Sequence, residues 1–105
     1  MIDTTLVPVF AALGDETRWH ILELLGQGDA SASALAERLP VSRQAIAKHL
    51  TVLRAAGLVA PVRRGRELQY RALGAELSAT ARRLDAIGAE WERRLVVIKH
   101  IAETL

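Results

Sequence analysis

The chain has 105 residues, half of them hydrophobic and a quarter charged, a composition typical of one globular domain and unlike that of a disordered tail. It contains no cysteine, which excludes disulfides, thiolate metal ligands and a cysteine nucleophile. The first residues lack the basic segment and long apolar core of a signal peptide, and no apolar run approaches the ~20 residues that cross a bilayer. We therefore expect a single cytoplasmic domain that makes no membrane contact.

The net charge of +2 conceals an uneven distribution along the chain. Residues 1–37 carry six acidic side chains and one basic one, whereas residues 38–71 carry eight basic side chains and one acidic one. The net charge is therefore −5 in the first segment and +7 in the second, where seven of the cations are arginines. The planar guanidinium of arginine suits phosphate and guanine. The middle third thus predicts a surface that binds a polyanion.

Two amphipathic helices are predicted in the first quarter of the chain. Apolar side chains recur at helical spacing over residues 4–13, and the first helix should begin just before Pro8, because proline is tolerated in a first turn. Gly14 should end this helix. The second helix should cover residues 16–25, with Trp19 on its buried side.

Two further helices, joined by a short turn, predict a helix-turn-helix. Ser33 should cap a short helix over residues 34–39. Ser42 should cap the next helix, which runs over residues 43–56 and stops at Gly57. The residues of this longer helix that we expect to face inward are Ile46, Leu50 and Leu53.

The period then changes from helical to alternating, which predicts a β-hairpin. Residues 58–62 are short and β-prone, and residues 68–72 alternate apolar with polar side chains. Pro61 restricts the first strand to the edge of a sheet. The connecting turn, residues 63–67, contains a glycine and three arginines. A basic hairpin tip suits a minor groove of DNA or its phosphates. The hairpin residues expected to contact DNA are Arg63, Arg64 and Arg66.

The last third of the chain predicts one long helix, residues 75–105, that forms a dimer. Its apolar and small residues alternate at steps of four and three, the heptad spacing of a helix–helix seam. Such a helix would reach about 45 Å, which is too long for a small domain to cover, although it could also lie across its own domain. Gly88 would permit close approach of two helices or mark a kink. The seam residues expected in the dimer interface are Leu84, Gly88, Trp91, Leu95, Ile98 and Ala102.

Several segments carry a family resemblance, in order and at matching spacings. They read FAALGDETRWHILELL at residues 10–25, LAERL at 35–39 and SRQAIAKHLTVLRAAGLV at 42–59, followed by the sequence RGR at 64–66 and by Tyr70. These segments resemble the ArsR/SmtB family of bacterial repressors, over roughly residues 9–73. The resemblance implies a winged helix-turn-helix, mainly α-helical with a small β-hairpin. Its core would be residues 4–73.

The resemblance also implies an assembly and a mode of action. Members of the family form homodimers through their first and last helices, which would add Leu6 and Phe10 to the interface. They bind an operator in double-stranded DNA, and an inducer relieves the binding. The inducer is left open here, as an unknown small-molecule effector or none.

The metal sites of the family are incomplete in this sequence. Metal-sensing members carry a Cys-x-Cys pair at positions that match Ser31 and Ser33, and serine hydroxyls cannot replace thiolates for soft metals. A second family site ends in a His-x-x-Glu pair, which His100 and Glu103 match, but apolar residues occupy the positions of its early pair. We therefore expect no metal and no cofactor.

The longer helix of the helix-turn-helix would enter the major groove, where its outward side chains reach base edges. Gln44 can pair with adenine through two hydrogen bonds, while Arg43 or Lys48 can meet guanine or phosphate. His49 lies at a family position near the DNA backbone and fits either a phosphate contact or packing between helices. The residues of this helix expected to contact DNA are Ser42, Arg43, Gln44, Lys48, His49 and Thr51.

Together these features predict a homodimeric transcriptional repressor that reads an imperfect inverted-repeat operator. Two alternatives remain open, namely a metal-responsive repressor with a site on the last helix and a non-specific architectural DNA-binding protein. An enzyme is not expected, because the sequence has no Gly-rich phosphate loop, no metal triad and no nucleophile with an obvious base. A winged helix that binds only proteins usually lacks basic residues on its recognition helix and wing. This chain has basic residues in both, at residues 43–56 and 63–67.

Overall fold

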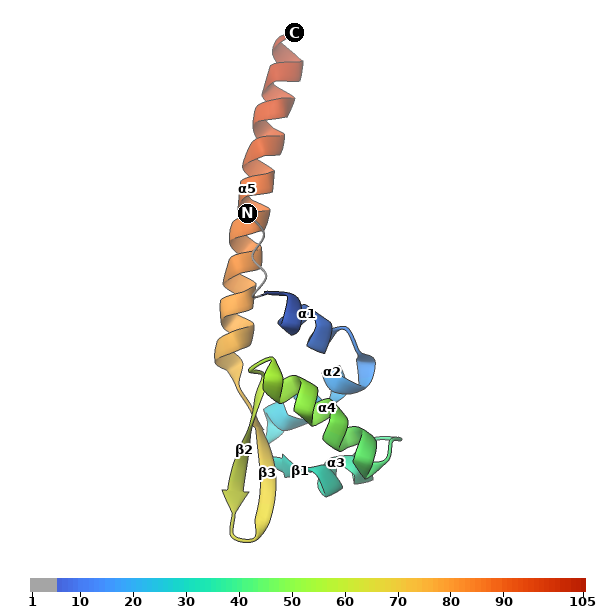
Figure 1. Ribbon diagram of the computed structural model, residues 1–105. Helices are drawn as coiled ribbons and strands as arrows, with labels where there is room; N and C mark the ends of the chain where they lie inside the picture. Colours follow the sequence, from blue (N-terminus) through green and yellow to red (C-terminus); the bar gives the residue numbers. More distant parts are fainter. Residues whose placement is uncertain (1–5) are drawn as a thin grey trace.

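The computed structural model describes residues 6–105, which form a small helical body with a three-stranded sheet and one long projecting helix (Figure 1). This arrangement confirms the predicted winged helix-turn-helix. Residues 4 and 5, where the predicted core begins, lie outside the described residues. The elements in chain order are α1 (Val7–Leu13), α2 (Glu16–Gln27), β1 (Ala30–Ser31), α3 (Ala32–Arg38), α4 (Arg43–Ala55), β2 (Val59–Arg64), β3 (Glu67–Ala72) and α5 (Gly74–Thr104).

Helix α1 starts and stops where its proline and glycine predict, and α2 follows after a cap. Pro8 occupies the first turn of α1, and Gly14 ends it. The Asp15 carboxylate then caps α2 by accepting a hydrogen bond from the Arg18 backbone N–H at 3.0 Å. Trp19 is 47% exposed, so the prediction that it is buried was wrong. The side of α2 that faces α1 is occupied by Arg18, which donates hydrogen bonds to carbonyls of α1. Trp19 lies about 100° further around the helix and therefore faces away from α1.

The start of α3 differs from the prediction by two residues. Ser31, and not Ser33, is the cap: its Oγ accepts a hydrogen bond from the Ala34 backbone N–H at 3.1 Å. Ser31 has the extended backbone that a cap requires, because it also belongs to the two-residue strand β1. Ser33 therefore lies inside the helix, and β1 itself was not predicted.

Helix α4 has the predicted cap, buried stripe and end. The Ser42 Oγ accepts a hydrogen bond from the Ala45 backbone N–H at 3.1 Å. The inward side chains Ile46, Leu50 and Leu53 are at most 1% exposed. They belong to the core, whose fully described members are Val9, Ala12, Ile21, Leu22, Leu25, Leu35, Ile46, Leu50, Leu53, Leu58 and Val59.

The helix ends in a Schellman motif centred on Gly57, whose φ is +77°. The Leu58 N–H donates to the Leu53 carbonyl, and the Gly57 N–H donates to the Arg54 carbonyl, both at 3.0 Å. Leu58 is fully buried, so this turn leads the chain directly from α4 into the wing.

The wing is an antiparallel sheet in the order β1-β3-β2. Pro61 lies in β2, which is an edge strand as predicted. The hairpin turn is tighter than expected: Arg64 pairs with Glu67, so only Gly65 and Arg66 lie in the turn. Gly65 has a φ of +62° and Arg66 does not have a positive φ, the combination found in type II′ hairpins. Arg63 and Arg64 are therefore strand residues, and the prediction that they lie in the turn was wrong.

Helix α5 is continuous over 31 residues and leaves the body after its first turns (Figure 1). It passes through Gly88 without a break, and Thr80 is its one buried residue among those described. The described chain extends over 70 Å along its long axis but only about 25 Å across it. The alternative that this helix lies across its own domain is therefore wrong.

We predict opposite effects for alanine at two glycines. Gly57→Ala should lower the free energy of unfolding by about 1 to 2 kcal/mol, because the left-handed φ at this position is costly for a residue with a Cβ. Gly26→Ala, inside α2 with no atom within 4 Å of its new Cβ, should be neutral or stabilise by up to ~1 kcal/mol. Urea denaturation at one protein concentration measures both, and equal effects would contradict the assigned C-terminal motif of α4.

Candidate nucleic-acid interface

The face of α4 opposite its buried stripe carries most of the predicted contact residues. Arg43, Gln44, Lys48 and Thr51 are all exposed. The Thr51 hydroxyl donates to the Ala47 carbonyl at 3.1 Å, so it offers lone pairs and a methyl group outward. Residues 43–51 of the helix thus present a mixed surface of cations, an amide and methyl groups.

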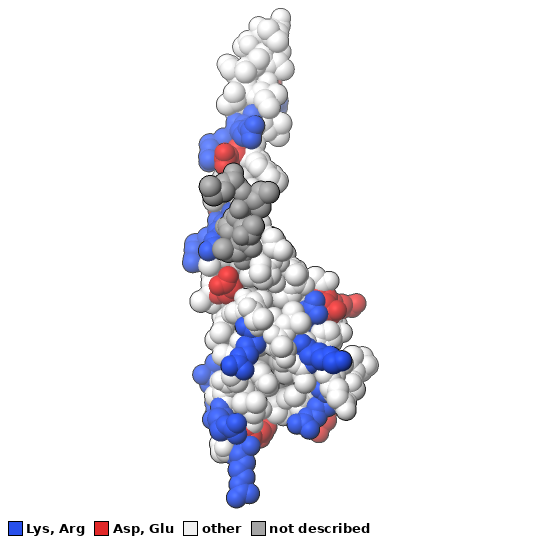
Figure 2. All heavy atoms as spheres, in the orientation of Figure 1, with Lys and Arg blue, Asp and Glu red and all other residues white. Residues whose placement is uncertain are grey.

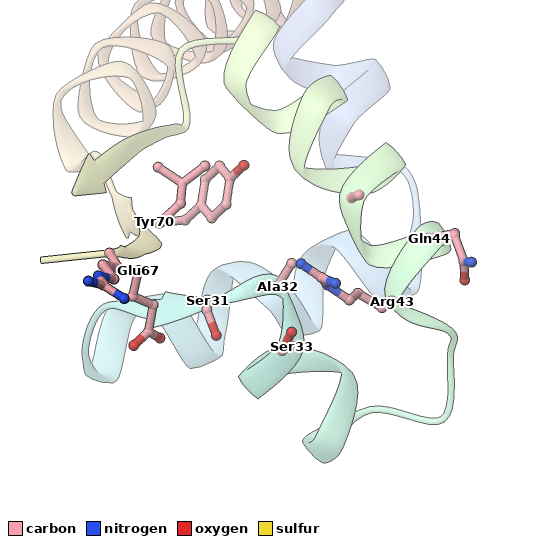
Figure 3. A pocket seen from close by; sticks show the side chains of 10 residues that line it. Ser31, Ala32, Ser33, Arg43, Gln44, Glu67 and Tyr70 are labelled. Atoms are coloured by element: carbon pink, nitrogen blue, oxygen red, sulfur yellow. The ribbon is translucent and has the colours of Figure 1, made fainter. Parts of the chain in front are cut away.

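A cleft of about 690 Å³ separates the N-terminal end of α4 from the wing (Figure 3). Arg43 reaches across it from α4 toward the start of α3, while Gln44 points away from the helix into solvent. Tyr70 of β3 closes the inner end, and it is half-buried against the core. The cleft is lined by Ser31, Ala32, Ser33, Arg43, Gln44, Ala47, Arg66, Glu67, Leu68 and Tyr70.

An ion-pair cluster around Asp29 attaches the wing to the body. Arg71 donates two hydrogen bonds to the Asp29 carboxylate, from Nε at 3.2 Å and from Nη2 at 2.8 Å. Arg64 donates one, from Nη2 at 3.3 Å. The hydrogen bonds from Arg71, with a smaller contribution from Arg64, lower the pKa of Asp29 below its ordinary value.

The wing cations therefore fall into two groups. Arg64 pairs with Asp29 inside the protomer while 58% of its side chain stays exposed, and its predicted contact with DNA stays a prediction. Arg63 and Arg66 are exposed, and within residues 6–105 neither has an ion-pair partner. Basic side chains gather on the lower part of the molecule, over α4 and the wing, whereas the far end of α5 shows few charges (Figure 2).

His49 lies on the flank of α4 and is half-buried. Its Nδ1 is 3.3 Å from Nη1 of Arg18, which belongs to α2. The structure thus places His49 in a contact between helices, the packing alternative of the sequence interpretation. Any role of its other ring nitrogen toward phosphate stays a prediction.

The residues predicted to form the dimer interface are distributed unevenly between surface and core. Trp91, Leu95 and Ile98 are each more than 60% exposed along the projecting part of α5. Leu6 is only 6% exposed, because it packs inside its own protomer and leaves little surface for a partner. The remaining predicted interface residues, which are exposed or half-buried, are Phe10, Leu84, Gly88 and Ala102.

No group of three His, Asp or Glu residues in the described part of the chain comes together as a metal site. No helix among the same residues is long and apolar enough to span a membrane.

Comparison with known proteins places this arrangement in a family. Residues 13–62 match a family model described as a helix-turn-helix domain. The transcriptional repressor SdpR of Bacillus subtilis is 39% identical over 62 residues, which span 59% of this chain and 69% of the repressor. The solved structure of an ArsR-like transcriptional regulator from Rhodococcus sp. RHA1 is 67% identical, with a TM-score of 0.94 over 96% of this chain and 93% of that one.

The chain belongs to the ArsR family of transcriptional regulators. A further similar structure is the homodimeric winged helix-turn-helix DNA-binding domain (fragment 1–100) of Mb0332 from Mycobacterium bovis. It is 27% identical, with a TM-score of 0.64 over 87% of this chain and 82% of that one. The family resemblance inferred from the sequence segments is thereby confirmed.

Two residues of this ArsR-family chain make contacts within the protomer that were missed in the sequence. Arg18 lies in the acidic first third and Asp29 in a loop, so neither belongs to the basic segment, residues 38–71, that predicts DNA binding. The one available signal for Asp29 was the excess of arginines in the wing, since a cluster of cations at short range favours a counter-ion. Arg18 gave no comparable signal, because its partners are backbone carbonyls and a distant histidine.

We predict that the stabilising effect of Asp29 depends on pH. Because its pKa is lowered in the folded state, its ion pairs stabilise the fold above the ordinary value of about 3.8, and this stabilisation is lost as the pH falls through the lower folded value. Asp29→Asn should thus be less stable than the wild type at neutral pH, and the two should converge in acid. Urea denaturation across this range tests the expectation, with Glu23→Gln on the exposed face of α2 as the matched control. A difference that persists unchanged into acid would contradict it.

Proposed function

We propose that this ArsR-family chain is a homodimeric transcriptional repressor that reads an inverted-repeat operator in the cytoplasm, with neither metal nor cofactor. The observation that carries the proposal is the joint placement of the outward face of α4 and the basic wing on either side of one cleft. An α-helix fits the major groove, and a basic hairpin tip fits the neighbouring minor groove.

The placement of side chains supports a division of labour at the DNA. Gln44 points into solvent from the first turn of α4, as a side chain that pairs with a base edge must. Arg43 and Arg66 border the cleft on opposite sides, which suits the phosphates of a strand that passes from one groove to the next. Arg63, which is exposed on the edge strand β2, is a further cation available to phosphate.

The projecting half of α5 supports pairing with a second copy. Its heptad seam is apolar and exposed, and isolated proteins rarely expose so many large apolar side chains in one stripe. The homodimeric domain from Mycobacterium bovis, which shares the fold, makes the same assembly reasonable here. A two-fold dimer would present two copies of α4 to successive major grooves, roughly 34 Å apart.

We predict different consequences for the two kinds of contact. Gln44→Ala should weaken binding to the preferred operator by about 1–3 kcal/mol and leave random DNA nearly unaffected, because a base contact is lost. Arg66→Ala should weaken all sequences alike and reduce the slope of log affinity against log salt by about one, because a phosphate contact is lost. Fluorescence anisotropy at several salt concentrations separates these effects, with the exposed Arg82→Ala on α5 as control. A wild-type protein that binds operator and random DNA equally would instead support the architectural alternative.

We also predict that the seam of α5 is the dimer interface. Leu95→Glu should convert the protein to a monomer in sedimentation velocity, because it would bury a carboxylate between two apolar stripes. Arg93→Glu changes charge on the opposite, outer side of the same helix turn and should remain dimeric. A Leu95→Glu protein that sediments as a dimer would show that the subunits pair through another surface.

A further inference from the structure

A polar cluster joins three helices of the body at the side chain of Arg18. Its Nε donates to the Ala12 carbonyl at 2.8 Å, and its Nη2 donates to the Ala11 carbonyl at 3.0 Å. These carbonyls belong to the last turn of α1, where the Ala11 carbonyl also accepts a hydrogen bond from the Gly14 N–H at 3.4 Å. The third nitrogen, Nη1, lies 3.3 Å from Nδ1 of His49 on α4.

A hydrogen bond at this contact is possible with only one tautomer of the His49 ring. A guanidinium has five N–H donors and no acceptor, so Nδ1 must accept the hydrogen bond. This hydrogen bond therefore requires the tautomer that carries the ring proton on Nε2. A protonated ring would turn an N–H toward a second cation. The Asp15 carboxylate, which also interacts electrostatically with His49, caps α2 and lies 3.9 Å from the same Nη1.

The position of His49 on α4 allows this contact to influence how the helix is oriented. His49 directly follows Lys48 and directly precedes the buried Leu50, so it sits at the edge between the DNA-facing and core-facing sides. The buried apolar stripe sets which side of α4 faces outward, through the close packing of Ile46, Leu50 and Leu53. A hydrogen bond at the edge of the stripe is directional, and it therefore adds a finer constraint on the rotation of the helix about its axis.

We propose that Arg18 is a positioning residue for DNA reading, which holds α4 in register by donating to Nδ1 of His49. The assignment rests on the proposed function. It makes Arg18 the connection between α1 and the reading helix, because the same guanidinium holds the end of α1. His49 acts through orientation, and sequence choice by Gln44 depends on it.

Two substitutions at His49 test the assignment. His49→Asn keeps an acceptor close to the place of Nδ1, whereas His49→Leu removes it at similar volume. His49→Leu should reduce the ratio of operator to random-DNA affinity by roughly tenfold, leaving random-DNA affinity and the salt dependence unchanged. His49→Asn should restore most of that ratio, and His20→Leu on the exposed face of α2 should leave it at the wild-type value.

A second measurement reads the contact without any DNA. In the wild-type protein at about pH 8, where an ordinary histidine is neutral, nitrogen-15 NMR should show the His49 proton on Nε2. In Arg18→Lys, which keeps the charge and loses the planar fork, this tautomer preference should weaken.

Three results would overturn the assignment. A proton on Nδ1 in the wild type would exclude the contact itself. Equal weakening of operator and random DNA by His49→Leu would make His49 a phosphate contact. An unchanged affinity ratio in His49→Leu would show that α4 is positioned by packing alone. In each case a wild-type preference for an operator leaves the proposed function standing, whereas a wild type without any preference overturns that function and the positioning role together.

Discussion

The burial of one apolar stripe on α4 decides which side chains this protein can offer to DNA. Ile46, Leu50 and Leu53 are essentially inaccessible to solvent, so the opposite side of the helix must face outward. That side carries Gln44 and Lys48. Everything proposed about recognition depends on this packing, because a different rotation of α4 would bring another set of side chains to the major groove.

Electrostatics refines what the packing allows. The basic middle third does not direct all its arginines freely outward, since the Asp29 carboxylate pairs with Arg64 and Arg71 within the protomer. These ion pairs orient the wing, and the cations that remain outward lie near its tip. Asp29, a carboxylate of the acidic first third, thus holds the basic wing in place against the body. Net charge by itself does not reveal which of these cations are paired within the protomer.

The sequence predicts the parts of this protein whose signals are local. The stripe of α4, its serine cap, its glycine end, the hairpin and the long final helix all follow from spacing over a few residues. The contacts that were missed join residues far apart in the chain: Asp29 meets Arg71 across 42 positions, and Arg18 meets His49 across 31. The start of α3 was misplaced for another reason, because two nearby serines both suit a cap and only strand β1 selects Ser31.

The central claim is that two copies of α4 and its wing read one operator together. Selecting a preferred site from random DNA and mapping it by hydroxyl-radical footprinting tests this claim most directly. We expect two protected segments on one face of the duplex, related by two-fold symmetry and centred roughly 34 Å apart. A single protected segment no longer than one half-site, or uniform protection without a register, would contradict the account.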